Sequence, residues 1–261
     1  MPNHVRNIII IEAEKEKITE ILNAIRNDEK GIGSIDFNKL IPMPESLNIE
    51  CGSNTRKGFE MFSDMRGKYE KLMQILNTTP DSEKFMFAVK LKKKLEKEIK
   101  DMSEEDRKLF DLGKRAFENI QNYGAPTWYE WSIDNWGTKW NAYDFDYDKD
   151  KTIYFNTAWS APHNILQALS EKYPEVHLEH GWADEDIGYN VGERTYQGGE
   201  ITYENIPAGG SKEAMDMAFS VRECSPEDYG LMLNSAGTEF IEAESDTRAL
   251  LPSSEDEEFE M

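Results

Sequence analysis

The chain has 261 residues, enough for one large domain or two small ones, and carries 51 acidic against 30 basic side chains, a net charge of −21. This balance excludes a general nucleic-acid coat protein, which needs a net basic surface, and a protein that lies on anionic membranes. The hydrophobic content of 38% and aromatic content of 11% exclude a wholly disordered chain.

The two cysteines, Cys51 and Cys224, lie far apart and have no metal-ligand spacing around them. We therefore expect no disulfide framework, no zinc site and no iron–sulfur cluster, and no other cofactor or metal is predicted. The longest apolar run, residues 8–11, is too short for a signal peptide or a membrane span. These features predict a soluble protein of the bacterial cytoplasm.

The first 55 residues show three periodic segments. Residues 5–11 are rich in β-branched side chains and predict a buried strand. Residues 16–27 carry apolar side chains at helical spacing, which predicts an amphipathic helix that ends near Gly31. Residues 32–41 alternate as a strand does and stop at Pro42, so a second strand is expected there.

The next part of the chain is rich in Lys, Glu, Leu and Met and has helical periodicity. Three helices are expected, over residues 59–76, 82–102 and 104–123, and Ser103 is the expected N-cap of the third. The basic run at residues 90–97 is expected to be a solvated helix face whose lysines pair with carboxylates one turn away.

After Pro126 the pattern turns to strands. A strand over 152–160, a helix that starts at 161–162, a strand over 176–183 and a hairpin over 187–205 are expected. Together with the first segments, this order predicts an α+β fold, a ferredoxin-like sandwich of two split βαβ halves. The expected segments are a first half (1–55), a helical insertion (56–123), a second half with a hairpin (124–208) and an acidic C-terminal extension (209–261).

The charge is unevenly distributed along the chain. Residues 121–261 hold 8 basic and 29 acidic side chains, a net −21, whereas residues 56–120 hold 16 basic and 13 acidic ones. Within the extension, a helix over 212–219 and a strand near 238–243 are expected, and the acidic tail after Pro252 is expected to be unfolded. The second half of the chain should therefore not bind nucleic acid.

Four segments of the chain are rich in uncommon residues: 1–5 (MPNHV), 128–142 (WYEWSIDNWGTKWNA), 155–162 (FNTAWSAP) and 183–192 (ADEDIGYNVG). In these segments the chain resembles the YubB-like ferredoxin-domain family of phages, prophages and conjugative plasmids. The resemblance covers about residues 1–50 and 124–205 and implies a ferredoxin-like fold and a mobile-element origin. It implies no catalytic residues.

The first group of candidate binding residues lies within residues 135–141, where two indoles, a cation and two amides surround a glycine. These side chains are Asn135, Trp136, Lys139, Trp140 and Asn141. Such a group can stack a base or grip a peptide. The alternative is that the two tryptophans cover the core while the polar residues close a turn.

The second group of candidates is acidic, and consists of Asp184, Glu185 and Asp186 with Asn190 nearby. Three carboxylates near the end of a strand could bind Mg²⁺ for phosphoryl chemistry, but the chain has no phosphate-binding glycine loop and no zinc-binding histidine motif. A calcium loop starting at Asp144 is excluded, because the sixth and twelfth positions are Lys149 and Phe155. The expected role of the alternating acidic residues at 144–150 is a solvated strand face that leads to a turn.

These observations predict a non-enzymatic accessory protein of a phage or other mobile element. Its expected partner is a host protein with a basic surface, such as a nucleic-acid-targeting defence protein that it inhibits by acidic mimicry. Two alternatives remain open: a metal-dependent enzyme acting on nucleotides or nucleic acid, and a single-strand binder that uses the tryptophans and the lysine-rich helix.

Overall fold

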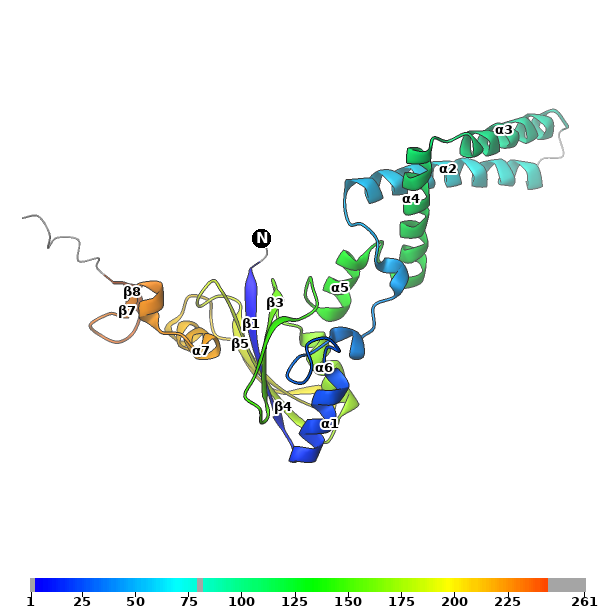
Figure 1. The fold of residues 1–261 in the computed structure, drawn as a ribbon. Helices are drawn as coiled ribbons and strands as arrows, with labels where there is room; N and C mark the ends of the chain where they lie inside the picture. The colour runs from blue at the N-terminus through cyan, green and yellow to red at the C-terminus, as the bar shows by residue number, and fades with distance from the viewer. Residues whose placement is uncertain (1–2, 79–81, 244–261) are drawn as a thin grey trace, which may run out of the picture.

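The computed structural model describes residues 3–78 and 82–243 and shows an α+β protein with a projecting helical arm (Figure 1). Its elements, in chain order, are β1 (His4–Glu12), α1 (Lys15–Ile25), η1 (Phe37–Lys39), η2 (Glu45–Leu47), α2 (Ser53–Thr78), α3 (Ser82–Lys100), α4 (Glu104–Tyr123), α5 (Trp128–Trp136), β2 (Tyr143–Tyr147), β3 (Thr152–Ala158), α6 (His163–Lys172), β4 (His177–Asp184), β5 (Val191–Gln197), β6 (Glu200–Asn205), α7 (Lys212–Arg222), η3 (Pro226–Tyr229), β7 (Leu231–Leu233) and β8 (Phe240–Glu242). No helix in this described part is long and apolar enough to cross a membrane.

The main sheet has six strands in the order β2-β3-β1-β4-β5-β6, and every neighbouring pair is antiparallel. Strand β1 lies between β3 and β4, which are therefore parallel to each other and are connected through α6. In the same way β1 and β2 are parallel and separated by β3. The first four strands thus form two split βαβ units, which confirms the predicted ferredoxin-like architecture, and β5 and β6 extend it.

The second strand of the first unit is not where the sequence predicted it. Residues 32–41 form a loop with the short helix η1, and the second strand is β2, about 100 residues further along the chain. Ile35 and Phe37 are fully buried, so their alternation reflects contact with the core and not strand pairing. The helical insertion therefore lies inside the first βαβ unit, between α1 and β2.

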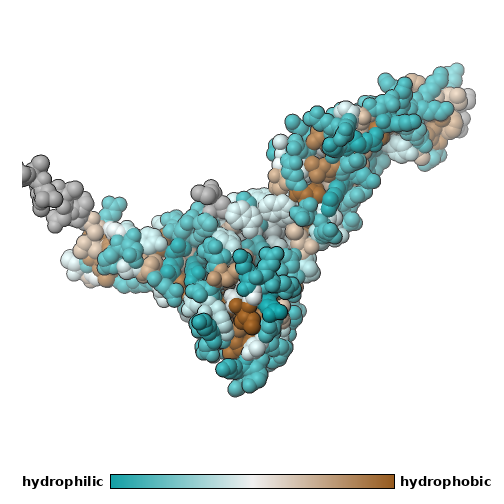
Figure 2. Space-filling model, viewed as in Figure 1, coloured by the Kyte–Doolittle hydropathy of each residue, from teal (hydrophilic) through white to brown (hydrophobic). Residues whose placement is uncertain are grey.

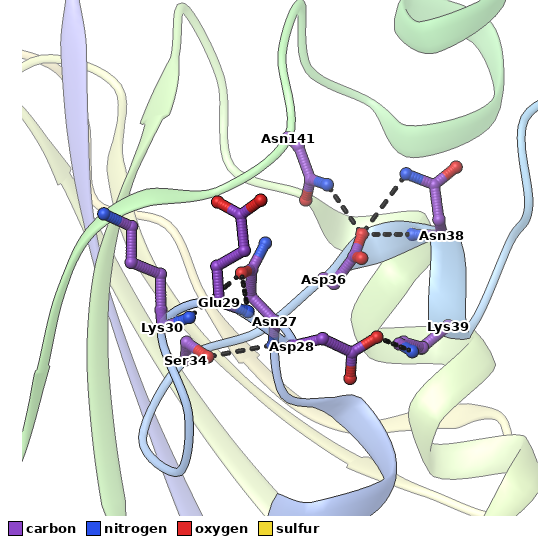
Figure 3. A network of polar contacts seen from close by, with 9 residues as sticks. All are labelled: Asn27, Asp28, Glu29, Lys30, Ser34, Asp36, Asn38, Lys39 and Asn141. Atoms are coloured by element: carbon purple, nitrogen blue, oxygen red, sulfur yellow. Dashed lines mark hydrogen bonds and ion pairs between the residues drawn. The ribbon is translucent and has the colours of Figure 1, made fainter.

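Side chains satisfy the backbone of this loop in place of a strand ladder (Figure 3). The Ser34 hydroxyl accepts the Asn27 N–H at 2.9 Å, and the Asp36 carboxylate accepts the Asn38 N–H at 3.0 Å and the Asn141 amide at 2.7 Å. The Asn141 carbonyl oxygen also accepts the Phe37 N–H at 3.0 Å. Local side-chain acceptors of this kind compete with sheet formation, and here they prevent it.

Two layers of helices cover the sheet. Helices α1 and α6 pack on the face that carries Ile9 and Ile11, where the main core lies, and α7 packs on part of the opposite face beside Ile8. The predicted helix over 212–219 and the strand near 238–243 are confirmed as α7 and β8. The acidic tail predicted after Pro252 lies outside the described residues.

The strand pattern expected after residue 124 is wrong for residues 128–136, which form α5. Thr127 caps this helix, and its last turn ends at Gly137 with a left-handed φ of +80°. Aromatic residues favour strands by propensity, but here two of them, Trp131 and Trp136, are buried against the main core on one side of a helix. Tertiary burial therefore overrides the propensity.

The predicted helices of the insertion are confirmed as α2, α3 and α4, and they project from the sheet as an arm (Figure 1). The Ser103 hydroxyl accepts the Asp106 N–H, as expected of an N-cap. Helices α2 and α4 cross at two glycines, where a Cβ on Gly113 would be 1.9 Å from the carbonyl oxygen of Gly58. The two backbones touch, so glycine is required there.

We expect Gly113→Ala to lower the free energy of unfolding by about 1–3 kcal/mol, because the added methyl group forces α2 and α4 apart. The matched control is Gly67→Ala on α2, where an added Cβ meets nothing within 4 Å. This control should raise the stability by about 0.5–1 kcal/mol through helix propensity. Urea unfolding followed by circular dichroism measures both, and equal effects of the two variants would contradict the crossing.

Candidate binding site

Two segments of the chain, α5 with the turn that follows it and the end of β3, meet at one end of the sheet. Tyr129 belongs to α5, Lys139 and Trp140 follow α5, and Trp159 follows β3. The Nζ atom of Lys139 is 4.5, 4.9 and 5.5 Å from the ring centroids of Trp159, Trp140 and Tyr129. Trp140 and Trp159 are 38% and 41% exposed. We call these four residues the aromatic platform.

The end of α5 fixes Lys139. The left-handed turn at Gly137 reverses the chain, so that the Lys139 N–H donates to the Ala158 carbonyl at 3.4 Å. The buried Ser132 hydroxyl donates to the Lys139 carbonyl at 2.8 Å. Both backbone groups of Lys139 are therefore held, and its side chain extends over the rings from a fixed origin.

Trp159 has an unusual backbone conformation. Its φ of +74° lies in the left-handed region, which a bulky side chain rarely adopts. Its N–H donates to the Asn3 carbonyl at 2.9 Å, and its carbonyl accepts the Asn190 amide at 3.0 Å. Such a conformation costs about 1–3 kcal/mol and persists only when its surroundings enforce it. The two asparagines enforce it here.

The buried carboxylate of Asp184 holds these asparagines in place. It accepts the Asn3 amide at 3.0 Å, the Asn190 amide at 2.9 Å and the Asp186 N–H at 3.0 Å. A buried carboxylate is stable only when its lone pairs are satisfied, and these three donors satisfy it. Asp184 is therefore a positioning residue for Trp159.

The surroundings of the platform are acidic on one side. Lys139 makes no ion pair within the part of the chain that the structure describes, while Asp144 and Glu185 are exposed near Tyr143. Burial, followed by the charges of Asp144 and Glu185, raises the pKa of Tyr143 to about 12. Tyr143 in turn meets Trp140 edge-on, at 6.4 Å between ring centroids. Asp144 and Glu185 therefore lie near Tyr143, which borders the platform at Trp140, and we call these two carboxylates the rim.

A groove adjoins the platform where the arm joins the sheet. It has a volume of about 430 Å³ and lies between α2, α4 and α5, and Arg56, Phe59, Ile120 and Tyr129 are among its lining residues. Tyr129 belongs to both the groove and the platform, so the two are adjacent.

The structure brings together only part of the first predicted group. Lys139 and Trp140 lie on the platform, whereas Trp136 is 4% exposed and packs in the core, where its indole N–H donates to Ile41. Asn135 donates to the Trp131 carbonyl inside α5. Asn141 belongs to the loop network of Figure 3. These three therefore have structural roles.

Sequence reasoning missed Tyr129 and Trp159 as site residues. Both lie within the segments that resemble a known family, which was the available signal. Neither stood out from the sequence alone, because nothing in it indicated that α5 and the end of β3 meet.

The acidic candidates do not converge on a common point. Asp184 is committed to amide donors, and Glu185 and Asp186 are exposed. Across residues 3–78 and 82–243, no group of three or more His, Cys, Asp or Glu side chains is placed to hold a metal ion. Asp184 acts through Asn190, and Glu185 contributes to the rim.

A second polar cluster is buried between α6 and the sheet. His180 is 1% exposed, its Nε2 lies 3.0 Å from the Asn7 amide oxygen, and its ring stacks on Trp182. His163 contacts the Tyr196 hydroxyl at 3.2 Å. Burial lowers the pKa of His163 to about 4 and that of His180 well below its ordinary value. Both rings are therefore neutral at neutral pH.

Comparison with known proteins supports the fold. A family model described as a ferredoxin-like domain in Api92-like protein matches residues 135–225. The match includes Lys139, Trp140, Trp159, Asp184 and Asn190, and excludes β1 and Tyr129. A search of the curated proteins finds no match.

Among solved structures, the crystal structure of protein api92 from Yersinia pseudotuberculosis is similar to this chain. The alignment covers 80% of this chain and 99% of that one, with 9% sequence identity and a TM-score of 0.36.

We expect Trp159→Gly to change the free energy of unfolding by less than about 1 kcal/mol, because the relaxed left-handed φ offsets the lost contacts with Lys139 and Tyr129. The control Trp136→Ala, at a buried indole, should cost about 3–5 kcal/mol. Urea unfolding measures both. Equal losses would show that Trp159 is a core residue and not part of an exposed surface.

We expect the stability to fall as the pH is lowered from 6.5 towards 4. In that window the unfolded chain takes up a proton on His163 while the folded chain keeps this ring neutral, which favours the unfolded state. Above pH 6.5 the ring is neutral in both states, so His163 no longer lowers the stability. His163→Gln should remove about 2 kcal/mol of the loss between pH 7 and pH 5, measured by urea unfolding at the two pH values. The control is His177→Gln, because His177 lies on the face of β4 opposite to that of His180. The same loss in His163→Gln as in the unchanged chain would contradict the assignment.

Proposed function

We propose that this protein is a non-catalytic binding protein whose aromatic platform contacts a basic partner protein. The observation that carries the proposal is the arrangement of Tyr129, Trp140 and Trp159 around one fixed lysine beside a carboxylate rim. Exposed aromatic rings are the residues that most often dominate binding energy at protein interfaces. Neutral hydrophobic partners would leave the rim carboxylates desolvated and unpaired, so the rim favours a cationic one.

Arginine side chains on the partner would match the platform best. A guanidinium group can stack on an indole and donate to a carboxylate at the same time, which a lysine ammonium does less well. Trp140 and Trp159 remain 38% and 41% exposed although Lys139 lies over their rings, and this exposed part supplies the stacking surface. Asp144 and Glu185 supply acceptors near Tyr143. The net −21 of residues 121–261 adds long-range attraction that speeds the encounter.

The finer proposal concerns origin and target. We place the protein in a phage, plasmid or other mobile element, acting in the cytoplasm of a bacterial host. Its target is a basic host protein that recognises nucleic acid, and a nucleic-acid-targeting defence protein is the natural class. An acidic surface that occupies the basic groove of such a protein would inhibit it by excluding nucleic acid. The support for this step is the charge distribution and the resemblance of the four segments.

The double variant Trp140→Ala/Trp159→Ala should lose the partner while it keeps the fold. The protein is immobilised and exposed to bacterial host lysate at about 50 mM and about 500 mM salt, and bound proteins are quantified by mass spectrometry. We expect basic proteins that the unchanged chain captures at low salt to be depleted at least about tenfold with the double variant.

The matched control is Tyr229→Ala, since Tyr229 is 40% exposed and lies in η3, away from the platform. It should capture the same proteins as the unchanged chain. Identical captured sets for all three proteins, or a set without basic members, would overturn the proposal.

A further inference from the structure

The solvent-facing side of α3 carries a row of lysines. The helix holds seven lysines and three glutamates in 19 residues. Four of the lysines follow helical spacing and therefore share one face: Lys90, Lys93, Lys94 and Lys97. All four are exposed. We call them the lysine row.

The four lysines of the row do not form the ion pairs that several other arm lysines form. None of its members makes an ion pair with a described residue, whereas Lys92 pairs with Glu96 and Lys68 pairs with Asp64. The sequence-based expectation that the basic run pairs with carboxylates one turn away is thus wrong for this face. Lys90, Lys93, Lys94 and Lys97 therefore bring four positive charges together on one helix face, although Glu98 and Asp101 lie one turn after Lys94 and Lys97.

Two large apolar side chains continue the same face. Met86 and Phe87 are 55% and 64% exposed and lie three to four residues before Lys90, which places them in line with the row. Figure 2 shows a mainly hydrophilic outer arm with hydrophobic atoms near its far end. The face therefore combines an exposed aromatic ring with consecutive cations.

The arm separates this face from the acidic body. Helix α3 is about 28 Å long at 1.5 Å per residue, and it lies at the far end of the arm from the sheet (Figure 1). The Debye length at physiological ionic strength is about 8 Å. The charges of the sheet domain are therefore largely screened at α3, and the total of −21 does not describe the field there.

The geometry points to a single-stranded nucleic acid as the ligand of this face. The lysine row would neutralise successive phosphates, and Phe87 would stack an unpaired base, the combination that strand binders without sequence preference use. A second copy of the same face is disfavoured, because like charges would meet. An anionic membrane is disfavoured because a planar surface would also approach the acidic body, whereas a strand can follow one helix.

The test is fluorescence anisotropy of the full chain with a labelled oligothymidylate of about 20 nucleotides, between about 50 and about 300 mM salt. Four phosphate contacts predict a slope of about −3 for the logarithm of the association constant against that of the salt concentration.

The variant Lys90→Gln/Lys93→Gln/Lys94→Gln/Lys97→Gln should bind at least about 30-fold more weakly at low salt, with a slope near zero. Phe87→Ala should weaken binding about tenfold with an unchanged slope.

The matched control removes four lysines that are each paired with a carboxylate one turn away: Lys68→Gln/Lys108→Gln/Lys114→Gln/Lys212→Gln. It changes the net charge equally and should keep the affinity within about twofold. Equal losses in both quadruple variants, no binding at low salt, equal binding of a duplex, or binding only to phosphatidylserine vesicles would each overturn the inference. The platform variant Trp140→Ala/Trp159→Ala should bind the oligonucleotide normally, so this inference and the proposed function fail separately.

Discussion

Strand β1 is the constraint on which the rest of the structure depends. It is hydrogen-bonded along both edges, to β3 from His4 to Ile10 and to β4 from Val5 to Glu12. Because both edges are used, β3 and β4 cannot be neighbours, and the chain must cross over through α6 to join them. The alternation of β1 also defines the layers, since Ile9 and Ile11 face α1 and α6 while Ile8 faces α7.

The platform depends on the same strand through its first residues. Asn3, directly before β1, bonds to both Asp184 and Trp159, at the ends of the two strands that flank β1. Loss of any of these donors would leave the buried Asp184 carboxylate unsatisfied and would lower the stability of the fold. The residues before β1, the turn after β4 and the end of β3 are therefore fixed together. This coupling explains how a bulky indole can remain at a positive φ on the surface.

The arm carries a second charged surface, the lysine row, at a distance from the platform. The arm, whose helices α2 and α4 cross at two glycines, holds α3 well away from the sheet. The positive charge of the lysine row is therefore not neutralised by the acidic sheet domain. If the platform binds a basic protein and the lysine row binds a strand, one molecule could contact a nucleic-acid-binding protein and a nucleic acid at opposite ends. The uneven charge distribution along the sequence would then correspond to two separate binding surfaces.

Local periodicity was sufficient to predict β1, α1, the arm helices, α6 and α7, because each buries one continuous stripe of its own residues. It failed at residues 32–41, where alternation came from core contacts of a loop, and at α5, where burial of Trp131 and Trp136 outweighed aromatic strand propensity. Lys139 and Trp140 could be nominated from the sequence, but Trp159 and Tyr129 could not.

The sequence by itself thus determined the fold class, most of the elements and the separation of charge, since these depend on spacing and composition within short segments. Only the tertiary structure decided which strand completes the first βαβ unit, and which side chains surround Lys139. Those outcomes depend on contacts between residues far apart in the chain, such as Asn3 with Asp184 and Asn190 with Trp159, and no local pattern encodes them.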